Sequence, residues 1–122
     1  MPRLRPSIAL LAAAIVLPAG CASTTKVAAA GTLRVALTEY HVQPQSVSAA
    51  GGTLTILVHN YGRLTHNLVI SHDGQTTGST EPLFPGQSAE LALNLAPGTY
   101  SMASTILSDE ALGAYGTLKV TQ

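Results

Sequence analysis

The amino-acid sequence predicts an all-β protein, an antiparallel β-sandwich. Apolar and polar side chains alternate over several short segments, as in strands that bury one face. Turn-forming pairs with glycine, asparagine or proline separate the segments at intervals of roughly 8 to 12 residues, which is typical of a sandwich. A mature length of about 100 residues suffices for one small domain. The chain has no Trp and one Phe, so we expect a core of Leu, Val, Ile and Ala.

The N-terminal segment has the organisation of a secretory signal. Arg3 and Arg5 precede an apolar run over residues 8–17, and small residues follow it. The run is shorter than the roughly 20 apolar residues that a transmembrane helix needs. We therefore expect residues 1–20 to be a signal peptide and the mature protein to be exported.

Cys21 is the only cysteine and follows these small residues directly. The segment from Leu17 to Cys21 resembles the lipobox of bacterial lipoproteins, in which the cysteine is lipidated and becomes the first residue. It departs from that motif at Pro18, where leucine is usual. The resemblance implies a lipid anchor on the cell membrane, with the protein facing the periplasm or the cell exterior. The alternative is an ordinary signal peptide followed by an incidental cysteine.

The segment after the cysteine differs in composition from the rest of the chain. Residues 21–30 are mostly Ala, Ser and Thr without alternation, so we expect a lipidated tether that spans at most ~30 Å. The domain is then expected over residues 31–122.

Alternation with a period of two marks five strands within this domain. Their apolar positions are Leu33, Val35 and Leu37; Leu54, Ile56 and Val58; Leu68 and Ile70; Ala89, Leu91, Leu93 and Leu95; and Leu118 and Val120. Between the last two strands we expect one or two helical turns, capped by Ser108 and ending at Gly113.

Charge and motifs exclude several functions. After the signal, the chain has four basic and six acidic side chains, so its charge is near −2. Without concentrated positive charge we expect no binding to nucleic acid and no electrostatic attachment to anionic lipid. The sequence contains no phosphate-binding loop and no paired-cysteine zinc motif.

The order of several short motifs resembles that of the cupredoxins, the family of plastocyanin and azurin. The matching segments are Pro97-Gly98-Thr99-Tyr100, Gly116-Thr117-Leu118-Lys119-Val120, His66-Asn67-Leu68-Val69-Ile70, and the stretch from Thr38 through Gly51-Gly52-Thr53. The resemblance covers residues 31–122 and implies a Greek-key sandwich of about seven to eight strands.

The resemblance also implies where copper ligands would lie. The family's first ligand is a histidine, which matches His66. Its cysteine, second histidine and methionine correspond, at a gapless spacing, to Ser104, Asp109 and Ala114. A blue-copper site needs two imidazoles and a thiolate with a weak axial thioether. We therefore interpret these four positions as vestigial, expect no metal and no cofactor, and expect a binding or accessory module whose partner is an extracytoplasmic protein or a small ligand.

Two other interpretations of the same residues remain. The first is a carrier of copper or another metal, or an electron-transfer protein, with an unconventional site contacted by His66, Met102 and Asp109. The purely structural alternative is that His66 stabilises the loops and Met102 fills the core. Further histidines stand at His41, His59 and His72. The second is a hydrolytic triad of Ser104, His66 and Asp109. Because a nucleophile elbow and an oxyanion hole are missing, we expect the protein not to be an enzyme.

Overall fold

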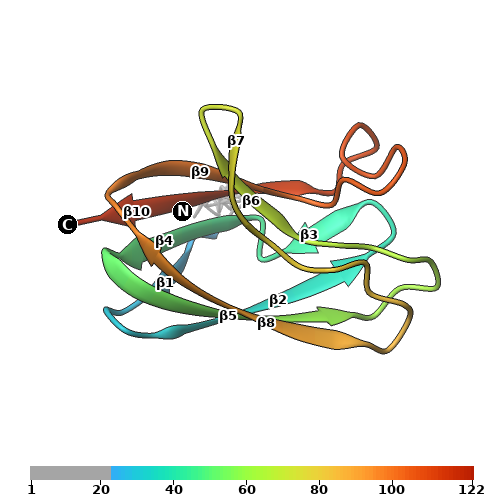
Figure 1. The fold of residues 1–122 in the computed structure, drawn as a ribbon, viewed down its shortest axis with the longest axis horizontal. Coiled ribbons are helices and arrows are strands. Elements are labelled where there is room, and N and C mark those ends of the chain that lie inside the picture. The colour runs from blue at the N-terminus through green and yellow to red at the C-terminus, as the bar shows by residue number, and fades with distance from the viewer. Residues whose placement is uncertain (1–22) are drawn as a thin grey trace, which may run out of the picture.

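The computed structural model describes residues 23–122, so the expected signal peptide and Cys21 lie outside the described residues. Ten strands form two packed sheets (Figure 1). In spatial order the first sheet contains β1 (Thr25–Val27), β4 (Ser46–Ala50), β10 (Tyr115–Thr121), β9 (Gly98–Ala103), β6 (Val69–His72) and β7 (Gln75–Ser79). The second contains β3 (His41–Gln43), β2 (Thr32–Thr38), β5 (Gly52–Asn60) and β8 (Ser88–Leu95). The predicted all-β sandwich is confirmed.

Strand number and pairing differ from the expected antiparallel arrangement of seven to eight strands. Three pairings are parallel, namely β1 with β4, β4 with β10 and β2 with β5. Each of these pairs joins strands that are not consecutive in the sequence, as parallel pairing requires a crossover connection between its two strands. Alternation identifies the buried face of a strand but not the direction of its neighbour.

The sandwich begins earlier than expected. Thr25–Val27, inside the segment expected as a tether, forms β1 and pairs with β4, with Thr25 opposite Val47. Val27 is half-buried and packs against the core. The strand is only three residues long, too short for alternation to reveal it. Only residues 22–24 therefore separate Cys21 from the first strand.

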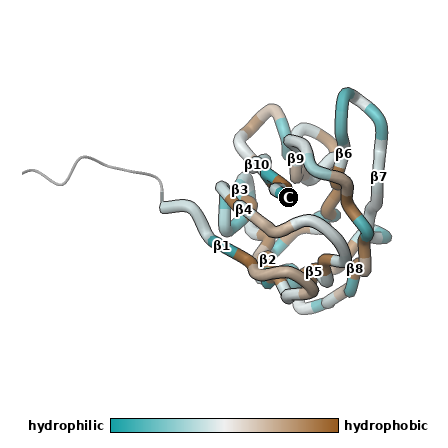
Figure 2. The backbone as a smooth tube through the Cα atoms, turned by 90° about the vertical axis from the view of Figure 1, so that its left-hand side faces the viewer, coloured by the Kyte–Doolittle hydropathy of each residue, from teal (hydrophilic) through white to brown (hydrophobic). Residues whose placement is uncertain are grey.

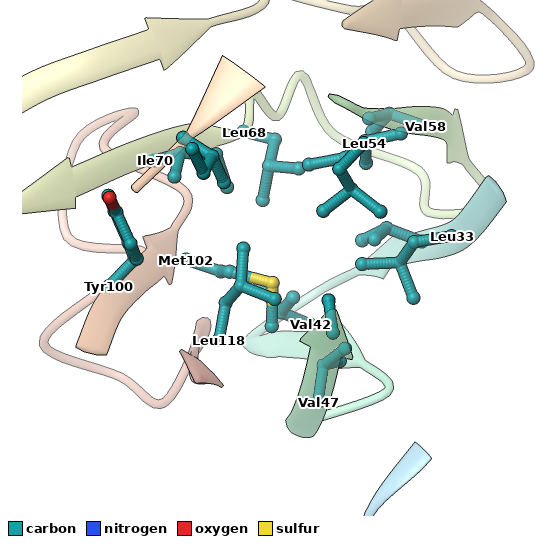
Figure 3. Packing of buried hydrophobic residues seen from close by; sticks show 14 of the residues in the cluster. Leu33, Val42, Val47, Leu54, Val58, Leu68, Ile70, Tyr100, Met102 and Leu118 are labelled. Carbon is teal, nitrogen blue, oxygen red and sulfur yellow. The ribbon is translucent and has the colours of Figure 1, made fainter. Parts of the chain in front are cut away.

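The core lies between the sheets, which Figure 2 shows as two layers. Its buried side chains come from both layers and include Leu33, Val42, Val47, Leu54, Val58, Leu68, Ile70, Tyr100, Met102 and Leu118 (Figure 3). Burying one such aliphatic side chain fully stabilises the fold by about 1.5–3 kcal/mol. Met102 is inaccessible to solvent, which confirms it as a core residue.

The connections between strands gather at two ends of the sandwich. We call one of them the loop end, at the right in Figure 1. It consists of residues 39–40, 61–68, 80–87 and 104–114, which link β2 to β3, β5 to β6, β7 to β8 and β9 to β10. The four positions interpreted as vestigial copper ligands lie there, whereas Met102 lies on β9. Within residues 23–122, no helix is long and apolar enough to cross a membrane.

Candidate functional site

His66 lies at the centre of the loop end and is fully buried. Its backbone forms an isolated bridge with Leu83, whose N–H donates to the His66 carbonyl at 2.7 Å. The ring is held between two carboxylates. Nδ1 lies 2.7 Å from Asp109 Oδ2, and Nε2 lies 3.3 Å from Glu39 Oε1. Both ring nitrogens therefore have a carboxylate partner from a different loop.

Asp109 connects the long loop between β9 and β10 to this histidine. The same oxygen that faces His66, Oδ2, also accepts a hydrogen bond from Ser104 Oγ at 2.7 Å. Asp109 is buried, with 6% of the residue's surface exposed. Its backbone carbonyl accepts from the Ala114 N–H at 2.9 Å. Asp109 thus connects the other three sequence-predicted ligand positions, His66, Ser104 and Ala114.

The loop that carries Asp109 is a series of turns. The expected helical turns are reduced to one α-turn, in which the Leu112 N–H donates to the Ser108 carbonyl at 3.0 Å. The next bond is of the tighter 3₁₀ type, from the Gly113 N–H to the Glu110 carbonyl at 3.1 Å, and Gly113, with a φ of 121°, ends the turns.

Asn67 extends the cluster in a way that the sequence did not reveal. Its N–H lies 3.3 Å from Ser104 Oγ, and its Oδ1 accepts the Thr105 N–H at 2.7 Å. Both bonds tie the start of the β9–β10 loop to the β5–β6 loop. The His66-Asn67 pair was visible as a family motif, but the pair alone does not show what Asn67 contacts.

Glu39 is the other residue that sequence reasoning missed. Its Oε1 accepts hydrogen bonds from the backbone N–H groups of Leu64, at 2.8 Å, and of Arg63. These bonds, Leu64 first, lower the pKa of Glu39 from its ordinary value of 4.5 to about 2. A Cβ at Gly62 would lie 2.5 Å from Oε1 and 3.0 Å from His66 Nε2, so glycine is required for this close approach.

The remaining histidines do not join this cluster. His59 Nδ1 bonds to Ser88 Oγ, and its ring packs against Tyr61 at a tilt of 56° with centroids 4.2 Å apart. His72 Nδ1 lies 2.9 Å from the Thr99 carbonyl, and His41 is exposed at the start of β3. In residues 23–122, no group of three or more His, Cys, Asp or Glu side chains could hold a metal ion.

The four predicted ligand positions do come together, but their side chains do not fit a blue-copper ion. They offer one imidazole, one hydroxyl and one carboxylate, where the blue-copper ion takes two imidazoles, a thiolate and a weak axial ligand. Ala114 is buried and has no donor atom. His66 Nδ1 and Ser104 Oγ both hydrogen-bond to Asp109 Oδ2, and His66 Nε2 faces Glu39 Oε1.

The order of Ser104, Asp109 and His66 differs from that of a hydrolytic triad. In a serine triad the imidazole lies between the hydroxyl and the carboxylate, so that it can remove the hydroxyl proton. Here Asp109 lies in the middle, and Ser104 Oγ donates to the carboxylate. The arrangement therefore gives Ser104 no imidazole base.

A hollow on the described surface lies away from this cluster. It measures about 540 Å³ and lies on the outer face of β2, β5 and β8. Arg34 and Glu90 flank Leu57 there, and the ring of Tyr61 lines one side. Its volume is within the range of small-ligand sites.

A two-sheet sandwich with this cluster of His66 and the β9–β10 loop at one end defines a cupredoxin-like domain. The sequence profile of the cupredoxin-like domain family matches residues 10–114, so the chain belongs to that family. A sequence comparison with curated proteins finds no match.

Solved structures share the fold at low sequence identity. Auracyanin from Roseiflexus castenholzii has a TM-score of 0.68 and 21% identity, over 75% of this chain and 97% of that one. Azurin from Methylomonas sp. strain J has a TM-score of 0.65 and 13% identity, over 75% and 98%. Auracyanin A from Chloroflexus aurantiacus, a "blue" copper protein, has a TM-score of 0.62 and 15% identity, over 75% and 100%. These similarities concern the fold alone.

Proposed function

We propose that the protein is a membrane-anchored, extracytoplasmic cupredoxin-like module that has no blue-copper centre and that binds or assists another molecule. The observation that carries the proposal is the hydrogen-bonded cluster of His66, Asp109 and Ser104. It occupies the place where the family resemblance puts three copper ligands, and His66 Nδ1 and Ser104 Oγ both bond to Asp109 Oδ2. The partner is an extracytoplasmic protein or a small ligand.

The absence of the thiolate is the main argument against electron transfer through blue copper. Thiolate coordination gives a blue-copper centre its colour and sets much of its reduction potential. A serine hydroxyl at position 104 does not ionise at ordinary pH. The only cysteine, Cys21, is at the proposed anchor.

Copper loading of the purified mature protein tests this proposal. After incubation with Cu(II) and desalting, we expect little retained copper by metal analysis and no intense visible absorption band. Weak binding to exposed histidines would be lost during desalting.

Retention of near-stoichiometric copper would contradict the proposal and favour the metal carrier as the alternative function. The variant His66→Ala would then separate the two kinds of site, with His41→Ala as its exposed control. Loss of copper only in His66→Ala would place the metal in the loop-end cluster. Equal retention in both variants would place it elsewhere.

A role without catalysis is part of the same proposal. It is supported by the order of the cluster, in which Asp109 separates Ser104 from His66. Hydrolysis of generic ester substrates that disappears in Ser104→Ala but not in Thr105→Ala would contradict it.

Lipid attachment through Cys21 accounts for the membrane location. One acyl chain holds a protein weakly, whereas two or more give stable attachment. Changing Cys21 to Ala should therefore release the protein or leave its precursor unprocessed. If a mature-sized Cys21→Ala protein fractionates with membranes as the parent does, the anchor lies elsewhere.

A further inference from the structure

All large apolar side chains that are exposed in residues 23–122 lie at the loop end or on the first residue of β10. They are Tyr40, Tyr61, Leu64, Phe84, Leu107, Leu112 and Tyr115. The connections at the opposite end expose none of this kind. Scattered apolar residues are normal on a protein surface, but their collection at one end marks an interaction site.

Leu107 is the most exposed of these apolar side chains. Its surface is 97% exposed, and its backbone has a φ of 51°, in the left-handed region that leucine rarely adopts. Because the exposed side chain has almost no packing partner within the domain, packing inside the chain does not explain this conformation. Strained residues of this kind often belong to binding surfaces.

The course of the chain before β1 favours the lipid bilayer as the binding partner of the loop end. β1 runs parallel to β4, and β4 runs parallel to β10, which starts at the loop end. The residues before β1 therefore lie on its loop-end side, where Thr24 contacts Ser46 through their side chains at 3.3 Å. From Thr25 back to Cys21, an extended chain reaches at most about 14 Å. An anchor at Cys21 would hold the domain close against the bilayer.

We propose that the apolar loop end rests on the lipid surface, with Leu107 and Leu112 in the boundary between headgroups and acyl chains. This inference rests on the lipid anchor of the proposed function. Apolar surface buried at such a boundary strengthens membrane binding beyond what the lipid chain alone provides. The loops carry charges of both signs, such as Arg63 and Glu110, so the contact requires no anionic lipid.

A single-tryptophan experiment tests this orientation, since the chain has no Trp. The full acylated protein with Leu107→Trp is reconstituted into phosphatidylcholine vesicles that contain brominated acyl chains, which quench tryptophan on contact. We expect strong quenching and a blue shift of the emission. Leu112→Trp provides a second probe of the same surface. The matched control is Gln75→Trp, an exposed position on β7 beside the turn at the opposite end, which should stay unquenched.

Vesicle flotation, measured on the same samples, separates this inference from the lipid anchor. If the proteins float but both loop-end probes remain unquenched, the anchor stands and the orientation is wrong. If the probes are quenched and Cys21→Ala still floats, the orientation stands without the anchor. If the proteins do not float, both are wrong.

A protein bound to the loop end would give a different quenching result. In native membranes the loop-end probes would then be shielded from aqueous acrylamide yet unaffected by brominated lipid. That outcome, or protection that requires a second copy of the chain at high protein concentration, would overturn the lipid contact.

Discussion

Replacing Asp109 with alanine tests the loop-end cluster most directly. The change removes the carboxylate oxygen that faces both Ser104 Oγ and His66 Nδ1 at 2.7 Å. Both partners are buried, so water cannot replace the lost acceptor without rearrangement of the loop. Leaving one buried donor without a partner costs about 1–3 kcal/mol, so two should lower the free energy of unfolding by about 2–6 kcal/mol. A domain of this size has only about 5–15 kcal/mol in total.

The assay is urea denaturation followed by far-ultraviolet circular dichroism. Asp109→Asn keeps one acceptor oxygen and should lose less stability than Asp109→Ala. Glu110→Ala is the matched control, because Glu110 is exposed in the same loop and its side chain has no partner in the described structure. A substitution of that kind should stay within about 0.5 kcal/mol. If Asp109→Ala unfolds at the same urea concentration as Glu110→Ala, the cluster does not stabilise the fold.

Two further predictions concern the carboxylate at the other ring nitrogen and the vestigial ligand positions. Because the pKa of Glu39 is lowered from 4.5 to about 2, its contribution to stability is present above pH 4.5 and is lost as the pH falls towards 2. Glu39→Gln should remove that part of the pH dependence of stability in urea titrations. If the pH dependence is the same as in the parent, Glu39 is not the group responsible. Ser104→Cys, Asp109→His and Ala114→Met in one chain should give a blue absorption band with Cu(II), although a displacement of ~1 Å defeats such a site. The band should vanish when His66 is also replaced, and a folded triple variant without copper would refute the ligand alignment.

The fold was predictable where side-chain alternation is long and apolar. Leu33, Val35 and Leu37 on β2 are buried as the pattern indicates, and so are the inward positions of β5 and β10. β7 contains only Gln, Thr, Gly and Ser, so no apolar period could identify it. β1 was missed for a different reason, since it is held by backbone pairing with β4 and only Val27 packs against the core.

The candidate site was predictable in its centre but not in its surroundings. The family motifs placed His66, Ser104 and Asp109 near one another, and the structure brings them into contact. Glu39 could not be found in this way, because it lies 27 residues from His66 in sequence and forms its two shortest bonds with backbone N–H groups. Backbone N–H groups are present at nearly every position, so sequence does not show which ones bind a given carboxylate.

The Asp109 side chain also affects how the domain is assembled. A loop that depends on a bound ion is complete only after the ion arrives, and the stability of such a protein follows the metal supply. Here the link between the β9–β10 loop and His66 consists of groups that the chain itself provides. Under the proposed function we therefore expect chelators to leave the unfolding temperature of the domain unchanged.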